Sequence, residues 1–96
     1  MQNEFFAGFA AYAVKLYDRE HITRVIQCES SWVVDPGGYH YGLAQFDAGT
    51  WDTVSAATGL SDWRQPYHQG ANMAVWLGMI DEPGGSGGWP WCWWDD

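Results

Sequence analysis

The sequence predicts a small, mainly helical domain with a short hairpin or an irregular loop near its middle. Its 96 residues suffice for one hydrophobic core but not for two. Hydrophobic residues make up 47% of the chain and aromatic residues 18%, so the chain has enough apolar surface to fold. Apolar residues recur at three- and four-residue steps, which is typical of amphipathic helices. Within this single domain, residues 1–96, we expect an N-terminal helix (1–17), a core (18–92) and a tail (93–96).

Two helices are expected in the first third of the chain. Apolar side chains at helical spacing predict the first helix over residues 3–17, with Asn3 as its N-cap. The second helix begins at residue 18 or 19 and ends near Glu29. Its apolar stripe leads to Glu29 at the spacing i, i+3, i+4 and i+7, through Ile22, Val25 and Ile26. Glu29 is therefore expected on the core side of this helix, at its C-terminal end.

Two further helices are expected in the second half. Asp47 is a suitable N-cap for a helix over residues 48–58, and Gly59 is a suitable C-terminal stop. Pro66 suits the first turn of a fourth helix that runs to about residue 80. Residues 35–38 (Asp-Pro-Gly-Gly) are a turn signal, which predicts the hairpin or irregular loop before the third helix.

The formal net charge of −8 limits the partners of this chain. Only four basic residues are present and they are scattered, which speaks against nucleic acid and against an anionic membrane surface. No apolar run approaches the roughly 20 residues of a membrane span, and the N-terminus lacks the basic region of a signal peptide. We expect a monomer without a cofactor. We also expect no metal site, because the histidines are dispersed and the cysteines lack zinc spacing.

Two cysteines, Cys28 and Cys92, allow one disulfide with one connectivity. The alternative is a pair of reduced, buried thiols in a cytosolic protein. We favour the disulfide, because it would tie the glycine-rich segment before Cys92 to the helix that carries Glu29. A disulfide in turn favours an oxidising compartment.

Glu29 is the residue that best suits catalysis of glycoside cleavage. This reaction needs a carboxylic acid that keeps its proton near neutral pH and donates it to the leaving oxygen. Burial penalises the charged form and raises a carboxyl pKa, and a helix C-terminus acts in the same direction. The alternative is a Glu29 that lies on a frayed helix end and pairs with Arg24 or with solvent.

Four short motifs occur in one order along the chain. Residues 28–30 are Cys-Glu-Ser, residues 42–46 are Gly-Leu-Ala-Gln-Phe, residues 49–51 are Gly-Thr-Trp and residues 89–92 are Trp-Pro-Trp-Cys. Together they resemble the small lysozyme-like transglycosylase domains of the resuscitation-promoting-factor type. Residues 29–32 (Glu-Ser-Ser-Trp) with a Pro downstream are also similar to the soluble lytic transglycosylases. The resemblance covers roughly residues 20–92.

The resemblance implies a lysozyme-like α+β fold and an enzyme that cleaves the β-1,4 bond between N-acetylmuramic acid and N-acetylglucosamine in peptidoglycan. It implies that Glu29 is the catalytic acid and that Cys28 is bridged to Cys92. In lytic transglycosylases one Glu serves as acid and then as base, while the muramic acid O6 hydroxyl attacks in place of water. The chain departs from the resuscitation factors in the loop over residues 33–41, has an acidic residue after Phe46, and lacks the Tyr-rich motif of larger transglycosylases.

Polar and aromatic side chains near the motifs are the expected substrate contacts. Gln45 and Thr50 are expected to bind sugar groups, with the alternative that they only hold the loop. Trp32, Tyr39 and Tyr41 are placed by sequence to flank a saccharide, and His40 is either a further contact or a surface residue. Trp51 and Trp76 fall on helix stripes and are expected in the core. The tryptophans near the C-terminus either pack around the disulfide or form an exposed patch: Trp89, Trp91, Trp93 and Trp94.

Hydrolysis by water, in contrast to transglycosylation, would need a second carboxylate as base. The candidates are Asp35 and Asp47. Asp35 precedes a proline and suits a turn, and Asp47 suits an N-cap. The sequence therefore favours a mechanism with Glu29 alone.

Two other functions stay open at this point. One is a wall-binding module that holds glycan without rapid cleavage, and the other is a structural domain of a phage tail. The expected partner of the enzyme and of the binding module is the glycan strand of peptidoglycan, and the expected location is the cell envelope, the extracellular space or a phage particle. The residue that separates enzyme from binding module is Glu29.

Overall fold

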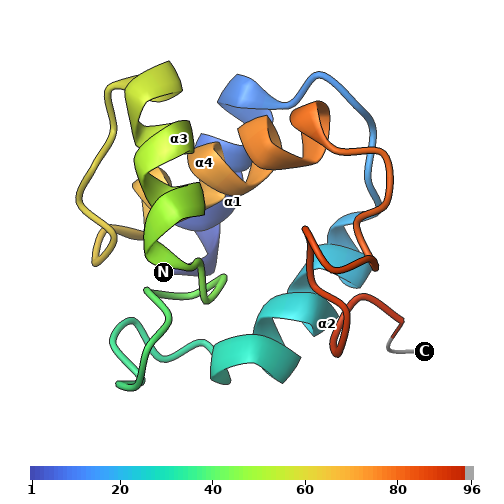
Figure 1. The fold of residues 1–96 in the computed structure, drawn as a ribbon, viewed down its shortest axis with the longest axis horizontal. Helices are drawn as coiled ribbons and strands as arrows, with labels where there is room; N and C mark the ends of the chain where they lie inside the picture. Colours follow the sequence, from blue (N-terminus) through green and yellow to red (C-terminus); the bar gives the residue numbers. More distant parts are fainter. Residues whose placement is uncertain (95–96) are drawn as a thin grey trace.

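A computed structural model describes residues 1–94, and this part of the chain contains four helices and no strand. The mainly helical domain is thus confirmed. Tyr41 and Phe46 form one isolated antiparallel bridge, so the loop before the third helix is irregular and is not a hairpin of two strands. The finer prediction of a lysozyme-like α+β fold stays a prediction. The helices are α1 (Gln2–Tyr12), α2 (Arg19–Ser30), α3 (Ala48–Thr58) and α4 (Pro66–Met79) (Figure 1).

The first helix is shorter than predicted. α1 ends at Tyr12, because Ala13 has an extended backbone with ψ 130°, so the predicted end at residue 17 was wrong. The chain then crosses to α2 with Leu16 fully exposed. Tyr17 instead packs edge-on against Trp93, with ring centroids 5.6 Å apart. Tyr17 thus makes a contact with the far end of the chain that no local pattern shows.

The predicted start of the second helix at residue 18 or 19 is confirmed, and so are the predicted cap and stop of the third helix. Asp18 precedes α2 and its side chain accepts a backbone N–H of the first turn. The Oδ1 atom of Asp47 accepts the Thr50 N–H at 2.7 Å at the start of α3. Gly59 ends α3 in the left-handed conformation at φ 76°, which glycine adopts without steric cost. Asn3, in contrast, lies inside α1 and is not its N-cap.

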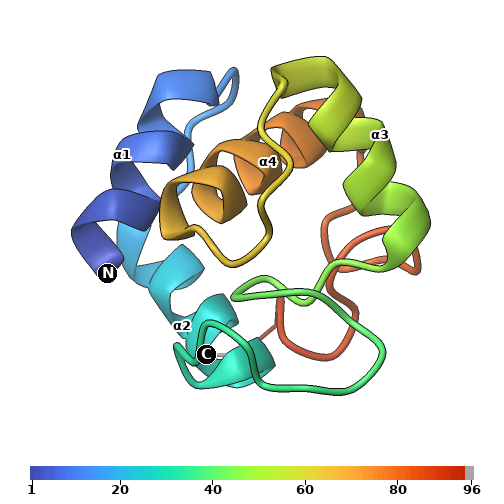
Figure 2. The same cartoon turned by 90° about the vertical axis from the view of Figure 1, so that its left-hand side faces the viewer.

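Helices α1 and α4 pack against each other closely through two glycines (Figure 2). A Cβ atom on Gly8 would overlap the carbonyl oxygen of Tyr67 in α4. A Cβ atom on Gly70 would overlap the carbonyl oxygen of Phe5 in α1. The absence of side chains at both positions therefore lets the two backbones meet.

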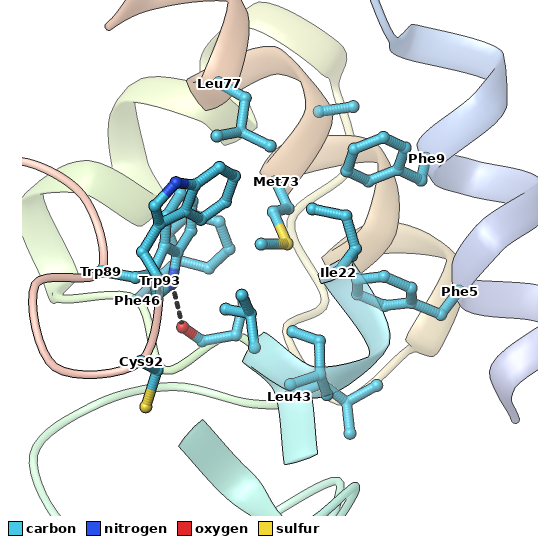
Figure 3. Packing of buried hydrophobic residues seen from close by; sticks show 14 of the residues in the cluster. Phe5, Phe9, Ile22, Leu43, Phe46, Met73, Leu77, Trp89, Cys92 and Trp93 are labelled. Atoms are coloured by element: carbon cyan, nitrogen blue, oxygen red, sulfur yellow. Dashed lines mark hydrogen bonds between the residues drawn. The ribbon is translucent and has the colours of Figure 1, made fainter. Parts of the chain in front are cut away.

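One hydrophobic core joins all four helices to the central loop (residues 31–47) and the C-terminal segment (residues 80–94). Fully buried Met73 and Leu77 of α4 lie at its centre, and each such side chain contributes about 1.5–3 kcal/mol by its burial. The tail expected over residues 93–96 is not separate, since Trp93 is buried; Asp95 and Asp96 lie outside the described residues. Figure 3 shows much of this cluster, including Phe5, Phe9, Ile22, Leu43, Phe46, Trp89 and Cys92.

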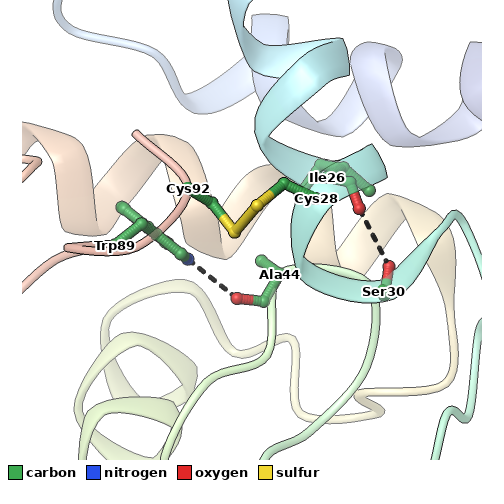
Figure 4. Close-up of a disulfide and its surroundings, with 6 residues drawn as sticks. All are labelled: Ile26, Cys28, Ser30, Ala44, Trp89 and Cys92. Atoms are coloured by element: carbon green, nitrogen blue, oxygen red, sulfur yellow. Dashed lines mark hydrogen bonds between the residues drawn. A yellow bond between two sulfur atoms is a disulfide. The ribbon is translucent and has the colours of Figure 1, made fainter. Parts of the chain in front are cut away.

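The predicted disulfide between Cys28 and Cys92 is confirmed (Figure 4). It joins the last turn of α2 to the C-terminal segment across 64 residues of sequence, with the two Cα atoms 5.6 Å apart. No helix within residues 1–94 has the length and apolar character needed to cross a membrane.

Candidate active site

A cleft of about 260 Å³ lies beside the disulfide. The end of α2, the central loop and the start of α3 line one part of it, and Trp76 of α4 and residues 86–91 of the C-terminal segment line the rest. The cleft brings together five of the residues predicted from sequence: Glu29, His40, Gln45, Asp47 and Thr50.

Glu29 reaches the cleft from the last turn of α2. The buried stripe of Ile22, Val25 and Ile26 fixes the rotation of this helix, and Glu29 follows on the same face. The side chain is partly buried, and this burial raises the pKa of the Glu29 carboxyl from 4.5 to about 7. A pKa raised in this way brings the carboxyl closer to the protonated state near neutral pH, as a general acid requires.

No basic side chain neutralises Glu29 in the described part of the chain. The last turn of α2 contains no basic residue. Arg24 lies 4.0 Å from Glu20, one turn earlier, and it makes no ion pair with Glu29. The pairing of Glu29 with Arg24, which the sequence left open, is therefore absent, and the partial negative charge of the helix C-terminus also disfavours an ionised Glu29.

Two buried side chains hold the central loop at the cleft. The Ala44 N–H donates to Oε1 of Gln69 at 2.9 Å, while the Ala44 carbonyl accepts the Trp89 indole N–H at 2.8 Å (Figure 4). Gln69 is fully buried in α4, and its Nε2 also donates to the carbonyls of Tyr41 and Trp63. The loop is therefore fastened from both sides immediately before Gln45.

Gln45 faces the cleft from this fastened loop with its backbone at φ 55°. Its Nε2 donates to the Gly42 carbonyl at 2.9 Å, and within residues 1–94 its Oε1 accepts no hydrogen bond. That oxygen is therefore suited to accept the N–H of an N-acetyl group. Gly42 itself lies at φ 73°, where a Cβ atom would also overlap Gln69. Exposed His40 and partly buried Thr50 add polar atoms to the same wall.

The two candidates for a second carboxylate lie in different places. Asp35 is outside the cleft, where it pairs with Arg64 at 3.7 Å and both side chains are more than half exposed. Asp47 lines the cleft, but its Oδ1 caps α3 through the Thr50 N–H. Glu29 and Asp47 are thus the carboxylates that line the cleft. No group of three or more His, Cys, Asp and Glu residues within residues 1–94 suits a metal ion.

Three aromatic residues that the sequence placed beside the substrate do not line the cleft. Trp32 follows the left-handed turn after α2 at φ 59° and packs edge-on against Phe5, with ring centroids 5.3 Å apart. Tyr41 stacks on Trp63 at 5.4 Å. Tyr39 is 95% exposed on the loop. The turn at the end of α2 therefore directs Trp32 against the core, and we do not include these three residues in the candidate site.

Sequence reasoning missed several parts of the cleft. Trp76 was expected in the core, but it is only partly buried, lines the cleft, and donates its indole N–H to the Gly87 carbonyl at 2.7 Å. Residues 86–88 of the glycine-rich stretch line the cleft, and this hydrogen bond ties them to α4. Gln69 was not singled out at all. A polar residue on an otherwise apolar helix stripe is the signal that would have identified it.

The chain matches no protein-family model, no curated protein and no solved structure. The candidate site therefore stands on its own residues, their geometry and the raised pKa of Glu29.

Proposed function

We propose that this domain cleaves the glycan strands of peptidoglycan as a lytic transglycosylase, at the β-1,4 bond between N-acetylmuramic acid and N-acetylglucosamine. The observation that carries the proposal is Glu29, a partly buried carboxyl in a cleft, without a cationic partner among residues 1–94 and with its pKa raised to about 7. The four motifs in lysozyme-like order support the same function. A lysozyme-like fold is part of this proposal.

In the proposed reaction Glu29 acts twice. It first donates its proton to the glycosidic oxygen, and the bond between that oxygen and C1 of the muramic acid residue breaks. The O6 hydroxyl of the same muramic acid then forms a bond to C1, and its proton passes to the Glu29 carboxylate. Glu29 is thereby restored without a water molecule, and the product ends in a 1,6-anhydro ring.

The role of Asp47, the second carboxylate that lines the cleft, supports transglycosylation over hydrolysis. A hydrolase would need a base to activate water, and Asp47 is the candidate within the cleft. Its Oδ1 already accepts the Thr50 N–H, so Asp47 has a structural role that explains its presence. Gln45 and Thr50 are proposed to orient the sugar rings, and His40 to contact them at the open side.

A disulfide is typical of oxidising compartments, so we propose that the domain acts outside the cell or in the cell envelope, as a secreted or phage-borne monomer. With a net charge of −8, its affinity for an anionic wall must come from hydrogen bonds and aromatic contacts.

Mass spectrometry of the soluble fragments released from purified cell walls tests the proposal. We expect fragments with 1,6-anhydro ends, which lack one water relative to hydrolytic products. Asp47→Asn is the matched variant, because Asn caps a helix about as well as Asp but has no carboxylate. Retained cleavage by this variant is the expected result. Reducing ends in the product together with inactive Asp47→Asn would instead identify a hydrolase with Asp47 as base.

The pH dependence of the rate follows from the pKa of Glu29. Cleavage requires the protonated acid, so kcat/KM should be level below pH 7 and fall about tenfold per pH unit above it. Initial rates of fragment release between pH 5 and 9 measure this fall in kcat/KM. A rate that keeps rising through pH 8 would contradict the role of Glu29 as the acid.

A further inference from the structure

Trp91 is a large aromatic residue that the packing of the fold does not explain. Its side chain is 91% exposed, yet it lines the same cleft as Glu29. Two neighbours in the same segment are buried instead: Trp89 is 4% exposed and Cys92 is 5% exposed. Trp91 therefore adds little to the core, and its apolar surface is available to a ligand in the cleft.

A rigid turn presents Trp91. The Cys92 and Trp93 amides both donate to the Trp89 carbonyl, at 3.3 and 2.9 Å, so the backbone on either side is fixed. The Trp89 indole is itself hydrogen-bonded to the Ala44 carbonyl of the central loop. A ligand that meets Trp91 thus loses little entropy in ordering the protein, which favours binding.

The disulfide limits the distance between the backbone of Trp91 and that of the proposed acid, Glu29. Trp91 precedes Cys92, and Glu29 follows Cys28, so each is one residue from a bridged cysteine. Consecutive Cα atoms lie about 3.8 Å apart, so the Cα atoms of Glu29 and Trp91 are separated by about 13 Å at most. One short oligosaccharide can therefore reach both residues.

We propose that Trp91 is a sugar-stacking platform that binds the face of a pyranose ring next to the bond that Glu29 cleaves; this inference rests on the proposed function. Pyranose rings have apolar C–H faces that pack on aromatic rings, and an indole offers a large, rigid surface for them. Stacking needs no positive charge, which suits a cleft whose charged side chains include Glu29 and Asp47. The contact of Trp91 with a sugar ring therefore does not depend on the charge of the ligand.

Trp94 provides a matched control. It is also a tryptophan of the C-terminal segment and is 69% exposed, but it packs beside Gly84 and does not line the cleft. A general effect of removing exposed indole surface would appear at both positions. An effect of stacking in the cleft would appear at Trp91 alone, and Trp91→Phe would retain most of the affinity because the phenyl ring keeps a π face.

The experiment measures binding of a peptide-free tetrasaccharide of alternating N-acetylglucosamine and N-acetylmuramic acid by calorimetry, in a Glu29→Gln background that prevents turnover. Adding Trp91→Ala should weaken Kd about tenfold or more, whereas adding Trp94→Ala should change it less than twofold. In the active protein, Trp91→Ala should raise KM more than it lowers kcat.

The proposed role of Trp91 would be overturned if the Trp91→Ala and Trp94→Ala proteins bound the tetrasaccharide with equal affinity. It would also be overturned if the Glu29→Gln protein did not bind the tetrasaccharide at millimolar concentration. If binding depends on Trp91 but the unsubstituted protein releases no fragments from cell walls, the platform stands and the proposed cleavage fails. If the unsubstituted protein cleaves glycan and Trp91→Ala leaves KM unchanged, the cleavage stands and the platform fails.

Discussion

Glu29→Gln should lower the rate of glycan cleavage by about 10⁴-fold or more, the upper end of the range for acid–base catalysis, because one residue supplies both steps. The amide keeps the shape of the side chain and its hydrogen-bonding capacity, but it has no proton to transfer. Fragment release from purified cell walls, followed by chromatography, measures the loss. Glu82→Gln is the control: Glu82 is exposed and lies outside the cleft, so its substitution should leave the rate unchanged.

The same substitution should stabilise the fold at alkaline pH. Because the pKa of Glu29 is about 7 in the folded protein against 4.5 in its ordinary state, the folded protein holds a proton between these values that the unfolded chain has lost. The free energy of unfolding of the unsubstituted protein therefore falls as the pH rises from about 4.5 to 7. At pH 8, Glu29→Gln should be more stable by on the order of 1–3 kcal/mol, and the difference should vanish near pH 4.

Urea denaturation of both proteins at pH 4 and pH 8 measures this difference. Activity lost while stability is kept or raised identifies a catalytic group. A destabilised Glu29→Gln protein that still cleaves glycan would show that Glu29 has a structural role, and Asp47 would then be the carboxylate to examine in the cleft.

Removal of the disulfide should have the largest effect on stability. In the chain-entropy model, a bridge across 64 residues stabilises the fold by about 4 kcal/mol. For a domain of this size, its loss in Cys28→Ala/Cys92→Ala should lower the melting temperature by about 15–30 °C. Differential scanning calorimetry measures the shift, and a reductant should lower the melting temperature of the unsubstituted protein but not that of the double variant.

The double variant should also lose activity where it is still folded. Cys92 anchors the segment that forms one wall of the cleft, residues 86–91, to the helix that ends beside Glu29. Without the bridge, this wall and Trp91 are held only by noncovalent contacts such as that of Trp89 with Ala44. A double variant that melts within a few degrees of the unsubstituted protein, with unchanged KM, would show that packing alone holds the wall.

Local patterns predicted those features that depend on near neighbours in the sequence. The cap by Asp47 and the stop at Gly59 gave the bounds of α3, and Pro66 gave the start of α4. The two cysteines allowed only one connectivity for the disulfide that we favoured over reduced thiols, and the helical spacing placed Glu29 in the last turn of α2. Each of these rests on interactions within a few residues or on a single possible pairing.

Long-range contacts decided what the local patterns missed. α1 stops at Tyr12, and Tyr17, which the pattern placed in the same helix, instead packs against Trp93 at the other end of the chain. The position of Gln45 depends on Gln69, a buried amide whose partners are spread over three segments. The periodic spacing of apolar residues cannot predict such contacts, because the residues that make them are distant along the chain.

The sequence by itself determined a small helical domain, its one disulfide and a carboxylate near a helix end. Only the tertiary structure decided which of the predicted site residues share a cleft: His40 and Gln45 do, while Trp32 packs against the core and Asp35 pairs with Arg64. The raised pKa of Glu29 likewise needs the fold, because it comes from burial by segments far apart in sequence. A sequence pattern gives the face of a helix, but burial and neighbours depend on what packs against that face.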